Sequence, residues 1–78
     1  MKDFEDWLEE VEKEIEKANI FELYKQSLLI KLHALKTNRT LSNLNYLMRW
    51  LHHYELPSLC PTPEEIDYWI EQGFLRKV

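Results

Sequence analysis

Apolar residues recur every three or four positions over the first eighteen residues of the chain, and the positions between them are polar, most of them charged. The apolar positions are Phe4, Trp7, Leu8, Val11, Ile15 and Ala18. This spacing predicts an amphipathic helix over residues 3–18 with one narrow apolar strip. Because the rest of that helix is polar, the strip must pack against another apolar surface, in the same chain or in a partner.

A second helix is predicted over residues 20–37. Asn19, with Glu22 three positions later, has the pattern of a helix cap, although a continuous helix through Asn19 is the alternative. The main apolar strip of this helix comprises Phe21, Tyr24, Leu28, Leu32 and Leu35, and a second apolar flank comprises Ile20, Leu23, Ile30 and Ala34. More than half of its circumference is apolar, so we expect it at the centre of the fold.

A third helix is predicted over residues 42–54, capped by Thr40 or Ser42. Its apolar strip comprises Leu44, Leu47, Met48 and Leu51, and an adjacent flank carries Tyr46, Trp50 and Tyr54.

The fourth predicted helix, over residues 63–72, has the clearest boundaries. Thr62 is the expected cap, Pro63 the first helical residue, Glu65 the partner in a capping box and Gly73 the end. Residues beyond Gly73 are expected to fold back onto this helix.

No segment alternates as a strand does, so the sequence predicts a small, compact all-α four-helix domain over residues 1–78. We expect helix 3–18 to pack on helix 20–37, with the last two helices closing the other side. Hydrophobic residues make up 45% of the chain, which favours a folded core, but so short a chain buries a small one. Cys60, the single cysteine, has no partner for an internal disulfide.

Charge is segregated along the chain. Residues 1–18 carry eight acidic residues against three lysines, a net charge of −5; residues 19–54 carry one acid against five basic residues, a net charge of +4. These blocks predict that the acidic first helix lies near the basic middle, within the chain or across a dimer. A candidate acidic face on the first helix comprises Glu5, Glu9, Glu12 and Glu16.

Recognisable active-site chemistry is absent from the sequence. His52 and His53 are adjacent, so on a helix their side chains point about 100° apart and do not converge on one ion. Cys60 has no associated oxyanion or base motif, and the single glycine excludes a phosphate-binding loop. We therefore expect a protein that is not an enzyme and has no catalytic, cofactor-binding or metal-binding residues.

The sequence argues against nucleic acid and membrane as direct partners. Acidic residues on helix 63–72 would repel phosphate, although a helical nucleic-acid-binding module remains an alternative if the basic middle is exposed. The acidic start lacks secretory features, and no segment approaches the roughly 18 apolar residues of a membrane span. The expected location is the cytoplasm.

Aromatic residues outside the main strips suggest a binding surface, because protein interfaces are enriched in Trp, Tyr and Arg. The candidate partner-binding residues are Tyr46, Arg49, Trp50, Tyr54 and Tyr68. The leading hypothesis is a non-enzymatic protein–protein interaction module (an adaptor, regulator or accessory subunit) that binds a protein partner, forms a homodimer, or both. Coverage of these rings by the first helix or the C-terminal residues is the structural alternative. A second functional hypothesis is a small acidic inhibitor, of phage or mobile-element type, that binds a nucleic-acid-binding protein.

Overall fold

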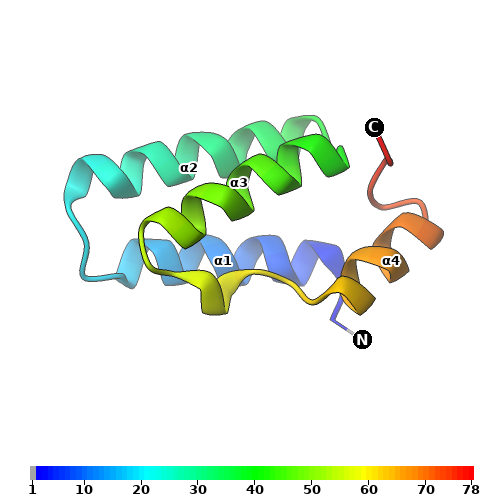
Figure 1. Cartoon of the computed structure of the whole chain (residues 1–78), viewed down its shortest axis with the longest axis horizontal. Coiled ribbons are helices and arrows are strands. Elements are labelled where there is room, and N and C mark those ends of the chain that lie inside the picture. The colour runs from blue at the N-terminus through cyan, green and yellow to red at the C-terminus, as the bar shows by residue number, and fades with distance from the viewer. Residues whose placement is uncertain (1) are drawn as a thin grey trace.

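The computed structural model describes residues 2–78 and consists of four α-helices and one 3-10 turn (Figure 1). The helices are α1 (Phe4–Lys17), α2 (Glu22–Thr37), α3 (Leu41–His53) and α4 (Pro63–Glu71), and the turn η1 (Pro57–Leu59) lies between α3 and α4. Within the described residues no strand forms, and the only β-type pairing is an isolated parallel bridge between Thr40 and Arg76. The predicted all-α four-helix domain is confirmed.

The first two helices are separate, and the prediction that Asn19 caps the second was wrong. Ala18 and Phe21 both have extended backbones, with ψ angles of 141° and 139°, and α2 begins only at Glu22. Asn19 therefore lies too early to bond the first turn of α2. The Phe21 carbonyl accepts from the amides of Tyr24 and Lys25 instead.

The last two helices begin as their boundary residues predict. The Thr40 side chain accepts from the Asn43 amide at the start of α3. In α4, Thr62 and Glu65 form a reciprocal capping box and Pro63 is the first helical residue. At the N-termini of α3 and α4, these side chains therefore accept from backbone N–H groups that have no partner within the helix.

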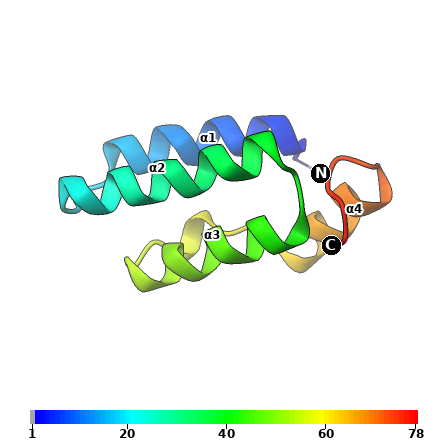
Figure 2. The same ribbon diagram turned by 90° about the horizontal axis from the view of Figure 1, so that it is seen from above.

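Helix α2 packs against both α1 and α3, and it lies between them in the view of Figure 2. Apolar side chains from all three helices contribute to the core. The strip of α1 is buried from Phe4 to Ile15, as expected. Helix α3 contributes Leu44, Leu47 and Leu51. None of the helices within residues 2–78 has the length and apolarity needed to cross a membrane.

Helix α4 lies at one end of the molecule beside the start of α1, rather than along α2 as the sequence suggested (Figure 1). The Trp69 ring is fully buried, with its centroid 4.9 Å from the ring of Phe4 and 5.5 Å from that of Trp7. Its indole Nε1 donates to the Lys2 carbonyl at 2.9 Å. The rings of Phe4 and Trp7 on α1 provide an apolar surface against which Trp69 is buried.

The residues after α4 fold back and complete the start of α3. Leu75 is buried in the core, while the Arg76 carbonyl accepts from the Leu41 amide and the Val78 carbonyl accepts from the Ser42 amide. Together with Thr40, these residues provide acceptors for the first amides of α3.

Helix α2 buries only part of its apolar surface. Leu28, Leu32 and Leu35 lie in the core, but Phe21 and Tyr24, which were expected there, are exposed. The second flank is also largely exposed, including Leu23, Ile30 and Ala34. The first turn of α2 lies beyond the buried leucines, and α1 and α3 together cover only one side of the helix.

Candidate functional site

Six rings from α2, α3 and their ends form a connected group at the surface, here called the aromatic face. They are Phe21 and Tyr24 at the start of α2, and Tyr46, Trp50, His53 and Tyr54 from α3 and its end. Phe21, Tyr24 and Tyr46 are 61%, 46% and 50% exposed. The buried rings of Phe4, Trp7 and Trp69 contact one another and form a different cluster. Within the aromatic face, Trp50 and Tyr54 also pack against the core.

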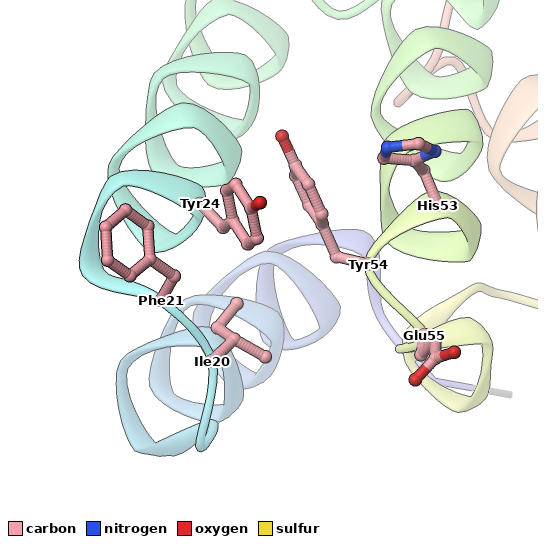
Figure 3. A pocket seen from close by; sticks show the side chains of 6 residues that line it. All are labelled: Ile20, Phe21, Tyr24, His53, Tyr54 and Glu55. Atoms are coloured by element: carbon pink, nitrogen blue, oxygen red, sulfur yellow. The ribbon is translucent and has the colours of Figure 1, made fainter.

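A pocket of about 330 Å³ lies at one end of the aromatic face, between the α1–α2 connection and the end of α3 (Figure 3). Its lining residues are Ile20, Phe21, Tyr24, His53, Tyr54 and Glu55. The rings of Tyr24 and Tyr54 stack with centroids 4.5 Å apart and planes 12° apart. This stack joins α2 to α3 and forms a flat apolar wall.

Glu55 has a left-handed backbone beside this pocket, with φ at 62°. It follows the end of α3, where the Glu55 amide donates to the His52 carbonyl and the Leu56 amide to the Leu51 carbonyl. That pair of bonds is a Schellman motif, in which glycine is the favoured residue at the left-handed position. A carboxylate therefore stands at the pocket rim on a backbone better suited to glycine.

Lys31 connects the middle of the aromatic face. Its ammonium nitrogen lies 4.9 Å from the Trp50 ring centroid and 5.5 Å from that of Tyr46, and it donates to Ser27 Oγ at 2.6 Å. This cation–π geometry keeps the two α3 rings beside α2. The Trp50 indole nitrogen is buried and has no acceptor among residues 2–78.

Four of the five candidate partner-binding residues lie together on α3 and at its end. Tyr46 is exposed, Trp50 and Tyr54 are half-buried, and Arg49 is exposed beside them, where it lines shallow depressions with Tyr46 and with Trp50. Tyr68 lies apart from them, half-buried on α4 against the core. Trp50 is partly buried against the core, and its ring also contacts Lys31, His53 and Tyr54.

The candidate acidic face of α1 lies beside basic residues of its own chain, as the charge blocks predicted. Glu12 pairs with Lys36 at 2.5 Å, and Glu5 pairs with Arg39. Glu9 and Glu16 are exposed, and the Glu16 backbone carbonyl accepts from the Lys25 ammonium. The basic middle is therefore partly neutralised within the chain, and so is this face. The acidic-inhibitor and nucleic-acid-binding hypotheses stay predictions without added support.

Three of the six rings of the aromatic face were not among the sequence candidates: Phe21, Tyr24 and His53. Phe21 and Tyr24 were assigned to the core because they continue the strip of Leu28, Leu32 and Leu35. The available signal was Lys31, which lies seven residues after Tyr24 and hence on the same side of the helix. A lysine on that side indicates that the side is not fully buried.

The histidines and the cysteine do not form a metal-binding or nucleophilic site within residues 2–78. No group of three or more potential metal ligands comes together within residues 2–78. Cys60 is half-buried, its Sγ lies 3.9 Å from the Met48 carbonyl oxygen, and burial raises the pKa of its thiol. A raised pKa keeps the thiol protonated and makes it a poorer nucleophile.

The fold and the aromatic face together define a small all-α domain with an exposed aromatic surface. No protein-family model, curated protein or solved structure matches the chain. Its function is therefore inferred from the surface itself.

Proposed function

We propose that this chain is a non-enzymatic protein–protein interaction module, an adaptor, regulator or accessory subunit, whose aromatic face binds another protein. One observation supports the proposal most directly: large rings are exposed in a connected group across α2 and α3 while the core holds its own separate aromatic cluster. Aromatic side chains dominate the binding energy of protein interfaces because they bury a large area with few rotatable bonds.

The chemistry of the aromatic face favours a partner that presents an apolar anchor together with a basic group. The Tyr24–Tyr54 stack offers an apolar wall, and the Glu55 carboxylate stands at the rim of the same pocket. An arginine or lysine side chain would contact the aromatic rings through its stem and head and pair with Glu55. The unfavourable backbone of Glu55 supports a binding role for its side chain.

Affinity capture with matched variants tests this function. The tagged chain, a Phe21→Ala/Tyr46→Ala double variant and a Phe74→Ala control are each used to capture proteins from the native host. Phe74 is an exposed ring in the segment after α4. That segment and the start of α2 lie at opposite ends of the molecule (Figure 1). We expect a partner that the unaltered chain and the control retain and the double variant loses. Identical captured proteins from all three would contradict a role for the aromatic face.

Fluorescence gives a second readout with a purified partner. Trp50 lies in the aromatic face, whereas Trp7 and Trp69 are buried in the core. Binding should therefore shift the emission of Trp50 and leave a Trp50→Phe variant without that shift. An unchanged spectrum at saturating partner would place the interface elsewhere.

A further inference from the structure

Two positive charges at the aromatic face have no acidic partner in the chain. Residues 23–54, which include most of α2 and all of α3, contain five basic residues and no aspartate or glutamate. Three of the five bond to α1: Lys25, Lys36 and Arg39. The other two, Lys31 and Arg49, form no ion pair with a carboxylate among residues 2–78. Their charges are therefore left without compensation from the chain itself.

Lys31 and Arg49 both lie beside Trp50, on different helices. The Lys31 ammonium is 4.9 Å from the Trp50 ring centroid, and its hydrogen bonds go to the hydroxyl and the carbonyl of Ser27. Arg49 is exposed and lines a depression of about 70 Å³ together with Trp50 and His53. Each of these three side chains carries an N–H group, and the indole N–H of Trp50 has no acceptor in the described part of the chain. Hydrogen-bond donors therefore outnumber acceptors here.

A carboxylate has the chemistry that this depression lacks. A guanidinium group binds a carboxylate through two parallel hydrogen bonds, and the second positive charge of Lys31 nearby further favours an anion. A nucleic-acid backbone fits less well, because it is bound by a longer track of basic residues, whereas the aromatic face offers two and carries the Glu55 carboxylate at one end.

We propose that the protein bound by the aromatic face presents an acidic side chain, aspartate or glutamate, whose carboxylate binds Arg49 beside the Trp50 ring. This inference rests on the proposed function, since it names the chemistry of the same partner. Together with the basic group expected at Glu55, it defines a partner segment with two anchors of opposite charge. Each anchor lies against an aromatic ring, which shields its ion pair from water and strengthens it.

Peptides selected from a displayed random library on the tagged chain serve as the probe. Only peptides that the Phe21→Ala/Tyr46→Ala variant fails to bind are carried forward. We expect them to share an acidic residue, and its replacement by the corresponding amide to weaken binding about tenfold. Arg49→Gln should weaken the original peptide by a similar factor. Both changes together should cost little more than either alone, because they remove the same interaction.

Lys13→Gln is the matched control, because Lys13 is an exposed lysine of α1, and it should leave binding unchanged. Independent, multiplying losses from the two changes, or selected peptides without an acidic residue, would overturn this inference and leave the binding role of the aromatic face intact. If no selected peptide depends on Phe21 and Tyr46, the proposed function fails and this inference fails with it. Binding of a labelled single-stranded oligonucleotide that Arg49→Gln abolishes would replace the acidic side chain by a nucleic acid and overturn the proposal.

Discussion

The three tryptophans differ in the environment of their indole nitrogens. Trp7 Nε1 donates to the Leu59 carbonyl at 3.1 Å, and Trp69 Nε1 donates to the Lys2 carbonyl. Trp50 Nε1 is buried without an acceptor among residues 2–78. A buried donor that lacks a partner costs about 1–3 kcal/mol, which is comparable with the gain from burying part of the ring.

Replacing Trp50 and Trp69 with phenylalanine should therefore have different effects on stability. Trp50→Phe removes the unpaired N–H together with some apolar area, so we expect little change in the free energy of unfolding. Trp69→Phe loses a hydrogen bond and leaves a cavity in the core, so we expect a loss of about 1–3 kcal/mol. Urea denaturation followed by circular dichroism measures both. Equal losses would contradict the assigned environments.

The Cys60 thiol should be protected in the folded chain. Burial raises its pKa, so the folded state favours the neutral thiol, and this contribution to stability is complete below the ordinary thiol pKa of about 8.5 and declines as the pH rises above it. At pH 8 we expect iodoacetamide to react more slowly with the folded chain than with the urea-unfolded chain. Equal rates would show that the thiol is not desolvated.

At the scale of elements, α3 and α4 both end in a Schellman motif, but the residue at the left-handed position is Glu55 in one and Gly73 in the other. The Gly73 amide donates to the Ile70 carbonyl and the Phe74 amide to the Trp69 carbonyl, as the Glu55 and Leu56 amides do at the end of α3. Gly73 has a φ of 83° and Glu55 a φ of 62°. Glycine adopts this conformation without steric cost, and glutamate does not.

Exchange of these two residue types should change stability in opposite directions. Glu55→Gly is expected to raise the free energy of unfolding by about 1 kcal/mol, and Gly73→Ala to lower it by about as much, because an added Cβ at Gly73 meets no neighbour and the cost is backbone strain alone. Thermal denaturation of both variants measures this. If Glu55 binds the partner as proposed, Glu55→Gly should also weaken capture despite its greater stability.

At the scale of the whole molecule, contacts between distant parts of the sequence close the bundle. Trp69 of α4 packs on Phe4 and Trp7, Leu75 is buried, and the following backbone bonds the first amides of α3. The ion pairs between α1 and the basic middle are partly exposed, so each contributes about 0–1 kcal/mol and mainly orients the helices.

Truncating the Leu75 side chain should destabilise the docking of the segment after α4 against the start of α3. Leu75→Ala is expected to cost about 2–5 kcal/mol, as for other fully buried leucines, and to speed amide exchange at Leu41 and Ser42. Hydrogen exchange and urea denaturation measure the two effects. Phe74→Ala, at the exposed neighbouring ring, is the control and should cost less. Slow exchange at Leu41 and Ser42 in Leu75→Ala would show that the segment stays docked without Leu75.

The sequence by itself determined the helices of this protein, because helix formation depends on residues that are close together in the chain. Periodicity was sufficient for the four helices and for the buried strip of α1, since a single narrow strip on a charged helix has only one way to face the core. Caps were predictable where side chain and backbone interact within a few residues, as at Thr40 and Thr62. The cap prediction at Asn19 was wrong because the backbone at Phe21 is extended and α2 begins only at Glu22, while Ile20 packs against the core between them.

Only the tertiary structure decided which apolar residues are buried. Helix α2 has apolar residues around most of its circumference, and its own sequence does not say which of them its neighbours will cover. The packing of α1 and α3 against α2 buries Leu28, Leu32 and Leu35. The apolar residues left exposed to solvent are Phe21, Leu23, Tyr24 and Ile30. Helix periodicity is a property of neighbouring residues, whereas burial depends on the relative placement of entire helices, so the candidate surfaces emerged only from the fold.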